Sequence, residues 1–284
     1  MPLFFVISGY FYKERKLKNF IFLKYKSLIL PYIYTCLAII SLSGILSIVK
    51  NLFFSKDIKI WLTMREWLLA SLYGSGSNEL LGIRAIGAIW FLLALFWSLC
   101  FLNILLKHKH KSLVVIILFF IGYFTKNIIW LPLSIQSGLC ALSYVYIGWI
   151  LNKYNLMTKL IDARIFIISI IIWLSGIYFG CGKLYLVVNY FGLTYFDFVV
   201  SIFAVISVFN IAYYIMKVKY ISNFLKYLGV NSLKILCFHI IELNLFPWYA
   251  IIKGIYAQKV IFISKIIFNV ICVGIFNFVK NRIK

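Results

Sequence analysis

Charged residues are scarce in this chain, and acidic residues are rarer still. Only 13% of the 284 residues are charged, with 7 Asp and Glu against 29 Lys and Arg. Average soluble domains are ~25% charged and ~45–50% apolar, whereas 64% of this chain is hydrophobic and its mean hydropathy is +1.00. A water-soluble fold of this length could not hide so much apolar surface. Because no polar stretch is long enough for a separate soluble domain, composition predicts a chain embedded in a lipid bilayer.

Cysteine pairs and metal-ligand spacings are also missing. The six cysteines are scattered singly and mostly inside apolar runs, so we interpret them as small packing residues: Cys36, Cys100, Cys140, Cys181, Cys237 and Cys272. The segment KHKHK at 107–111 is typical of a basic loop rather than a metal site, and no metal is predicted. No Walker loop is present, so nucleotide hydrolysis is not indicated.

The excess of positive charge does not indicate a nucleic-acid partner. The formal net charge is +22, but the basic residues lie in short loops between apolar runs, as in the cytoplasmic loops of membrane proteins. The predicted partner is therefore the lipid bilayer, and no nucleic acid is predicted. The same charge could also hold anionic lipid or a phosphorylated cofactor at the cytoplasmic face.

Eight apolar segments follow an opening apolar run at 2–12, which is only about half of a ~20-residue span. We interpret them as helices, because only helices and closed barrels satisfy the backbone in lipid. The predicted limits are 27–49, 86–106, 112–125, 128–151, 165–182, 197–216, 230–252 and 259–279. The sequence thus predicts an all-α polytopic membrane protein with about nine transmembrane helices, the first one partial, in a single domain over 1–284.

The segment 51–80 differs from the spans around it. It mixes Trp61, Trp67 and leucines with charges, which predicts an interfacial helix on the membrane surface. The sequence GSGSNE at 74–79 then predicts a flexible loop.

The distribution of Lys and Arg predicts the orientation. With the loop after residue 12 placed in the cytoplasm, cytoplasmic segments carry twice as many Lys and Arg as outer segments, as the positive-inside rule requires. This orientation places Met1 outside, before a half-length span. The opening run lacks the basic start and cleavage site of a signal peptide. One helix before Met1 would complete the span, so the sequence predicts that the chain lacks its first helix, through a late start codon or a truncated gene.

Four segments carry a family resemblance in chain order. They are PLFFVISGYFYKERKLKNFIFLKYKSLILPYIY at 2–34, IGAIWFLLALF at 86–96, LSYVYIGWIL at 142–151 and YLGVNSLKILCFHI at 227–240. Together they resemble the membrane-bound acyltransferase 3 family, in particular its fucose-4-O-acetylase-like branch.

The resemblance implies a core of about ten transmembrane helices in the bacterial cytoplasmic membrane. It also implies an O-acyltransferase that moves an acyl group, often acetyl, from acetyl-CoA or another acyl-CoA to a hydroxyl of a cell-surface or secreted carbohydrate. Acyl-CoA would be the donor substrate, and no bound cofactor is implied. In this branch a His commonly precedes the Met-Pro-Leu-Phe-Phe segment, so a chain without that helix is expected to be inactive by itself.

A carrier or flippase for a glycan or lipid-linked intermediate is the alternative. Such a protein would also be polytopic and basic. It would be expected to show internal repeats with broken helices at matching positions, and no such repeat is evident in the sequence.

Acyl transfer to a hydroxyl needs a base, and His239 is the candidate. It lies near the middle of the predicted span 230–252, with Glu242 three residues further on the same helical face. Polar groups at this depth usually face the protein interior or a water-filled cavity. The resemblance favours His239 and Glu242 as catalytic residues, with Glu242 orienting His239. The alternative is a packed histidine that is hydrogen-bonded between helices.

The donor also needs a site for its phosphates. Lys24 and Lys26 lie near the membrane, before the bend that Pro31 predicts, and could hold CoA phosphates from the cytoplasm. The alternative is that they only set topology, the role we assign to Lys13 and Lys18.

Four further residues are candidates for the substrate cavity. Ser8 and Gly9 are small residues that we expect to permit tight helix packing beside it. The alternative is a nucleophilic Ser8, but no serine elbow motif surrounds this residue. Trp90 could form a wall for the sugar or an aromatic belt anchor. Asn231 could bind substrate or, with Ser232, cap the late helix.

The orientation makes a prediction about labelling. We expect Lys109 and Lys217 in the cytoplasm and Asn78 outside, because of the Lys and Arg distribution. In intact cells, a membrane-impermeant thiol reagent should label a cysteine introduced at position 78 but not one at position 109. The reverse pattern would contradict the orientation.

Overall fold

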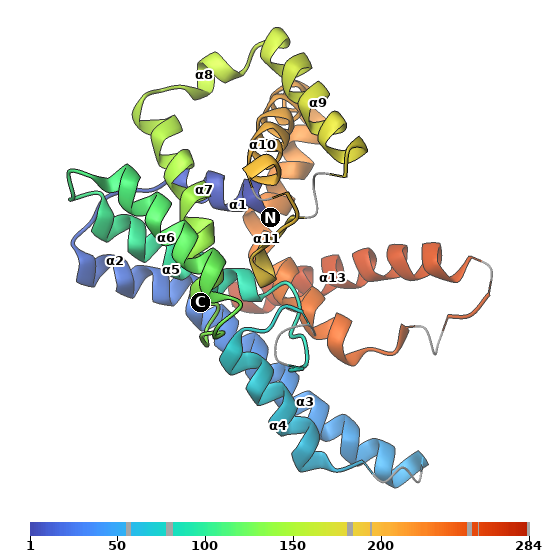
Figure 1. The fold of residues 1–284 in the computed structure, drawn as a ribbon. Helices are drawn as coiled ribbons and strands as arrows, with labels where there is room; N and C mark the ends of the chain where they lie inside the picture. The colour runs from blue at the N-terminus through green and yellow to red at the C-terminus, as the bar shows by residue number, and fades with distance from the viewer. Residues whose placement is uncertain are drawn as a thin grey trace.

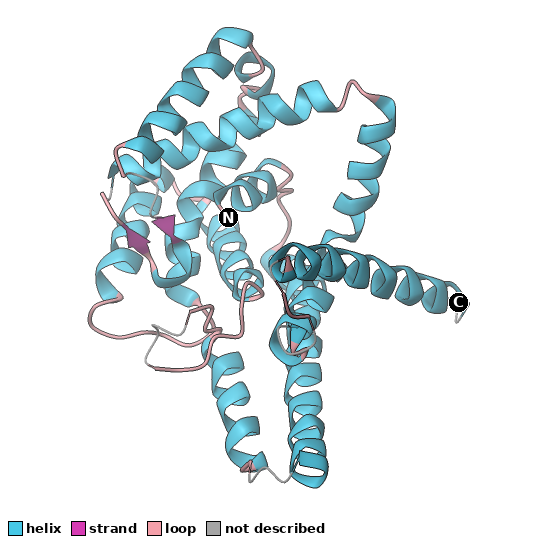
Figure 2. Ribbon diagram, turned by 90° about the vertical axis from the view of Figure 1, so that its right-hand side faces the viewer, coloured by secondary structure: helices cyan, strands magenta, loops and turns pink. Residues whose placement is uncertain are grey.

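The computed structural model describes residues 1–54, 58–77, 82–180, 184–193, 195–248, 252–254 and 256–282. Helices make up most of this part of the chain, which confirms the all-α prediction (Figure 1). One small departure is a two-stranded antiparallel hairpin of β1, Leu184–Tyr185, and β2, Tyr190–Phe191 (Figure 2).

In the described part of the first half of the chain there are seven α-helices and one π-helical turn. Their bounds are α1 Pro2–Tyr10, α2 Leu17–Lys24, the π-helix η1 Tyr25–Ile29, α3 Leu30–Phe54, α4 Ile60–Tyr73, α5 Trp90–Leu105, α6 Lys111–Thr125 and α7 Ile135–Lys153.

The second half contains the hairpin and the longest single helices. Its elements are α8 Met157–Leu160, α9 Ala163–Tyr178, the hairpin with the 3-10 turn η2 Leu186–Val188, α10 Tyr195–Ile215, α11 Lys219–Leu245 and α13 Ala257–Arg282.

Four helical runs in the described residues are long and apolar enough to cross a membrane. They are Leu17–Phe53, Phe196–Ile215, Lys219–Leu245 and Ala257–Val279. Three apolar helices are shorter: Trp90–Leu105, Lys111–Thr125 and Ala163–Tyr178. These helices support a multi-pass membrane protein, whereas the predicted count of about nine spans is not confirmed.

The helices at two of the predicted spans, 128–151 and 230–252, begin at other residues than predicted. The span predicted at 128–151 becomes helical only at Ile135, because Pro132 cannot donate a backbone hydrogen bond and Leu133 and Ser134 both adopt positive φ. The span predicted at 230–252 starts earlier, at Lys219, and ends at Leu245.

The helical run formed by α2, η1 and α3 is longer than a bilayer requires. Its 37-residue apolar part, Leu17–Phe53, would extend about 55 Å at ~1.5 Å per residue, against a hydrocarbon core of ~30 Å. The run therefore has to tilt strongly or project from the membrane.

Helix α4 packs antiparallel to α3 and does not lie alone. The Tyr32 hydroxyl donates to the Ser71 carbonyl (2.6 Å), and a Cβ on Gly44 would lie 3.2 Å from the Met64 sulfur. The buried face of α4, which includes Trp67, therefore has α3 as its partner. The predicted position of this helix at the membrane surface stays a prediction.

The predicted loop after α4 is held in place where it begins. The Ile86 amide donates to the Ser75 carbonyl at 2.6 Å, so these first residues are fixed against 82–89. Asn78 and Glu79 lie outside the described residues.

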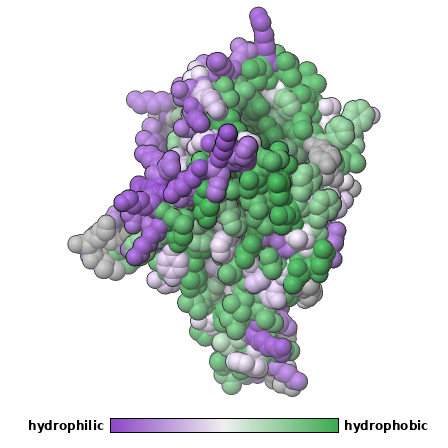
Figure 3. Space-filling view, turned by 60° about the vertical axis from the view of Figure 1, so that its left-hand side comes forward, coloured by the Kyte–Doolittle hydropathy of each residue, from purple (hydrophilic) through white to green (hydrophobic). Residues whose placement is uncertain are grey.

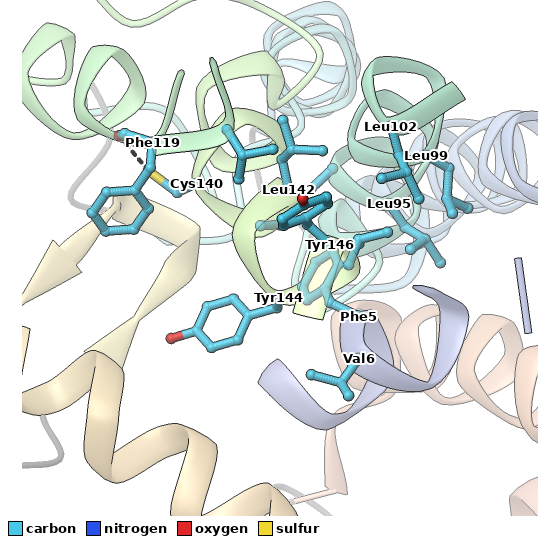
Figure 4. Close-up of a cluster of buried hydrophobic side chains, with 14 of the residues drawn as sticks. Phe5, Val6, Leu95, Leu99, Leu102, Phe119, Cys140, Leu142, Tyr144 and Tyr146 are labelled. Carbon is cyan, nitrogen blue, oxygen red and sulfur yellow. Dashed lines mark hydrogen bonds between the residues drawn. The ribbon is translucent and has the colours of Figure 1, made fainter. Parts of the chain in front are cut away.

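The main core forms where α1 meets α7 and α5. Figure 4 shows Phe5 and Val6 of α1 directed towards side chains from these helices. The largest group of buried side chains includes Leu95, Leu99, Leu102, Leu142, Tyr144 and Tyr146.

Two glycines allow the backbones of α1 and α7 to touch. A Cβ on Gly9 would lie 1.9 Å from the carbonyl oxygen of Val145, and one on Gly148 would lie 2.0 Å from that of Val6. Both distances are far below van der Waals contact, so each position accepts only glycine at this helix separation. Small residues at helix contacts serve this purpose in membranes.

Hydrogen bonds between side chains join the other helices. Ser207 of α10 bonds to Ser169 of α9 (2.8 Å), and Ser201 of α10 bonds to Tyr144 of α7 (2.8 Å). Such polar contacts help to hold helices together where lipid supplies no hydrogen bonds.

The hairpin is tied to the end of α6. The Asn189 side chain, which is fully buried, donates to the Gly122 carbonyl (2.9 Å), and Lys126 donates to the Asn189 carbonyl (2.7 Å). The hairpin also buries Leu186 and Phe191 in the main core.

A broad apolar surface surrounds the helices. Figure 3 shows hydrophobic side chains over much of one face, with polar side chains gathered at one side. On α9 the exposed apolar residues include Ile167, Ile171 and Leu174. In water such a surface would be costly, whereas lipid would cover it.

The glycine contact gives a prediction about stability. Gly9→Ala should lower the yield and thermal stability of the folded protein, because the added methyl group meets a backbone carbonyl. Overpacking typically costs about 1–3 kcal/mol. Gly274→Ala in α13 is the matched control, since open space surrounds that position. Equal melting temperatures of the two variants would contradict the contact.

Candidate active site

Helix α11 places His239 and Glu242 side by side. In an α-helix, residues three apart share one face, and Nδ1 of His239 lies 3.1 Å from Oε2 of Glu242. The His239 side chain is 41% exposed, whereas the Glu242 side chain is fully buried. The pairing predicted from the sequence is therefore present, with the carboxylate inside and the imidazole at the edge.

Three other groups surround the Glu242 carboxylate. Nε1 of Trp248, just after α11, donates to Oε1, and Nζ of Lys265 lies 3.8 Å from the same oxygen. Nδ2 of Asn269 donates to Oε2 at 3.4 Å. Both oxygens thus have donors, which is what a buried carboxylate requires.

Helix α13 supplies two of these groups because it packs against α11 in the antiparallel direction. Residues late in α11, at Glu242, meet residues early in α13, at Lys265 and Asn269. Lys265 and Asn269 are four residues apart, so they share one face of α13.

A second polar cluster lies at the other end of the same helix pair. Lys234 donates to the side-chain oxygens of Asn231 (3.2 Å) and Asn277 (2.5 Å). The Asn277 amide also donates to Asn231 (3.1 Å). Eight residues separate Lys234 from Glu242, which is about 12 Å along a helix.

This geometry corrects one interpretation of Asn231. Helix α11 begins at Lys219, so Asn231 and Ser232 lie well inside the helix and cannot cap it. Asn231 is buried at the contact with α13. A role in substrate binding stays a prediction.

The predicted cavity residues of α1 lie in a packed region. Gly9 is buried against α7, which supports the packing interpretation of this small residue. Ser8 is half-buried beside it, and its place in the substrate cavity stays a prediction.

Trp90 begins α5 and is buried. Only 4% of it is exposed, and a Cβ on Gly76 would lie 2.2 Å from its ring. A belt anchor faces the lipid boundary, so burial argues against that interpretation. Its role as a wall for the sugar stays a prediction.

Lys24 and Lys26 lie against different aromatic rings of the same helix. Lys24 lies 5.6 Å from the ring of buried Phe20, whereas Lys26 lies 4.4 Å from the ring of exposed Phe22. Each lysine thus pairs with the ring four residues earlier. Phosphate binding by the two lysines stays a prediction.

The arrangement can support proton transfer. In the described residues, His239 bonds through Nδ1 only, which leaves Nε2 without a protein partner on a side chain that is partly exposed. A carboxylate that accepts the Nδ1 proton fixes the tautomer with a free lone pair on Nε2, as in Asp–His pairs of hydrolases. Among the described residues, no group of three or more His, Cys, Asp and Glu could hold a metal ion.

Sequence reasoning did not find Lys265, Asn269 or Trp248 as site residues. A usable signal was present, because Lys265 and Asn269 are polar residues four apart within an apolar span. Their partner could not be identified without the register between α11 and α13.

The comparisons with known proteins support the family resemblance. The acyltransferase 3 family model, described as an acyltransferase domain, matches residues 1–278. No curated protein and no solved structure matches the chain. The matched range includes every residue of the candidate site.

Proposed function

The chain belongs to the acyltransferase 3 family. We propose that it is an O-acyltransferase that uses acyl-CoA as the donor. It would transfer the acyl group, in the simplest case acetyl, to a hydroxyl of a cell-surface or secreted carbohydrate. The observation that carries this proposal is the contact between a partly exposed imidazole and a fully buried carboxylate, 3.1 Å apart. Such a pair supplies the base that a hydroxyl acceptor needs.

In this mechanism His239 acts as the base. Nε2 takes the proton of the acceptor hydroxyl while the hydroxyl oxygen attacks the thioester carbonyl carbon. The tetrahedral intermediate then collapses, the bond from carbon to sulfur breaks, and the protonated imidazole returns its proton to the leaving thiolate. Glu242 holds Nδ1–H throughout and stabilises the imidazolium that forms.

We further propose how the protein sits in the membrane. The shorter apolar helices α5, α6 and α9, together with α7, would complete a bundle of about nine spans, with α1 as a partial one, in the bacterial cytoplasmic membrane. Acyl-CoA would arrive from the cytoplasm, where the basic loops lie.

His239→Ala tests the proposal directly. The substitution is placed in the gene at its own chromosomal locus, and O-acetylation of surface carbohydrate is measured by mass spectrometry. The acetylation per folded protein should fall ~10²–10⁴-fold. This is the typical cost of losing a general acid or base.

A matched control separates chemistry from packing. His108→Ala changes a histidine in the connection between α5 and α6 and should leave acetylation unchanged. If His239→Ala lowered only thermal stability, with turnover per folded molecule near the unsubstituted level, His239 would not be the base.

The donor site is tested by changing two lysines. We propose that Lys24 and Lys26 hold CoA phosphates, so Lys24→Gln with Lys26→Gln should weaken acetyl-CoA binding to the purified protein. A charge-assisted contact is worth about 1.5–3 kcal/mol, which calorimetry resolves. Lys13→Gln with Lys18→Gln is the control, because these lysines are assigned to topology. Equal dissociation constants for the two double variants would remove the pair from the donor site.

A further inference from the structure

Glu242 has two potential cationic partners, one on each oxygen. Nζ of Lys265 lies 3.8 Å from Oε1, and Nδ1 of His239 lies 3.1 Å from Oε2. Trp248 and Asn269 add only neutral donors. Lys265 and His239 therefore contact the same carboxylate from its two oxygens.

We propose that Lys265 is a positioning residue that keeps His239 neutral by supplying the one positive charge which the buried Glu242 carboxylate requires. With that charge present, His239 needs to donate only a neutral N–H from Nδ1. Its Nε2 then keeps the lone pair that a base must have. Without Lys265, the buried carboxylate would need another opposite charge beside it. The imidazole, 3.1 Å away, is the group that can supply this charge by taking a second proton.

Burial supports the assignment. The Glu242 side chain is fully buried and that of Lys265 is only 18% exposed, so solvent screens this ion pair less than a surface pair. The His239 side chain is 41% exposed, so its ring lies at the edge of the cluster, whereas the lysine and the carboxylate lie further inside.

Other titratable groups on the packed elements have different partners. On α11, Lys234 bonds to Asn231 and Asn277. Cys237 of α11 faces Thr35 and Cys36 of α3. Ahead of α5, Arg84 pairs with Glu66 of α4, and on α3 the Tyr32 hydroxyl donates to the Ser71 carbonyl. Lys265 is thus the cation with a direct contact to Glu242.

The protonation state can be measured without any substrate. The chain has three histidines, so His108→Gln with His110→Gln leaves His239 as the only one. Nitrogen and carbon chemical shifts of the isotope-labelled ring then report its tautomer and charge in the detergent-solubilised protein. In this background we expect a neutral ring with its proton on Nδ1 at pH 7.

The substitution Lys265→Met should convert this ring to the imidazolium form at pH 7. An opposite charge within ~4–6 Å favours the charged form by about one to three powers of ten, and the Glu242 carboxylate, no longer balanced by a lysine, lies 3.1 Å from the imidazole. Lys265→Arg should keep the ring neutral, because it restores the charge. Lys259→Met is the control on the same helix and should change nothing, since Lys259 lies by Tyr256.

A double variant tests the cause. Adding Glu242→Gln to Lys265→Met removes both charges and should return the ring to its neutral form. If Lys265→Met does not fold, Lys265→Gln replaces it with the same expected result, because Gln keeps a donor near Oε1. A ring that stays neutral in the Lys265 variants, or one already charged before substitution, would overturn the inference.

The consequence for catalysis rests on the proposed function. At pH 7 Lys265→Met should lower acyl transfer by ~10-fold or more and recover part of it at higher pH, whereas Lys265→Arg should not show this pH dependence. If the NMR signals change as expected but the pH profile of the activity does not, the role of Lys265 stands and His239 is not the base.

Discussion

A carboxylate with no exposed surface must be surrounded by donors, and Glu242 imposes this requirement on the last two long helices. It orients His239 on its own helix, and it draws Lys265 and Asn269 of α13 to the same point. The chain after α11 turns back so that Trp248 can also donate. The register of α11 against α13, and with it the candidate site, follows from the cost of burying one negative charge.

The two polar clusters make the two ends of the α11–α13 pair chemically different. One end carries the acid, a lysine and a histidine, whereas the other end carries Lys234 between two asparagine side chains. In the proposed orientation the asparagine end is the cytoplasmic one, because α13 finishes at the basic carboxyl end of the chain. A pair joined at both ends in this way is fixed against sliding along its axis.

The fold class, the family and the pairing of His239 with Glu242 could be predicted from the sequence, because each depends on residues that are close together in the chain. Residues three apart on a helix meet whatever surrounds them. Lys265, Asn269 and Trp248 depend instead on how two helices align, and no local pattern determines that. The same reason explains Trp90, which is buried against Gly76, 14 residues earlier in the chain. It also explains α4, where Met64 meets Gly44 of α3, 20 residues earlier. Helix ends also differed where tertiary contacts acted, as at Ser134, which bonds to the Gly74 carbonyl.

The backbone contact between α1 and α7 has a consequence for how such chains can diverge. At Gly9 and Gly148 each glycine meets a carbonyl of the opposite helix, so neither helix can compensate a change in the other by altering a side chain. Lipid-facing positions such as Ile167 and Ile171 carry no such restriction, because any apolar side chain meets the same solvent there. Substitutions should therefore accumulate freely on the outer faces of related chains, while this crossing point persists as a pair of glycines even where little else of the sequence is shared.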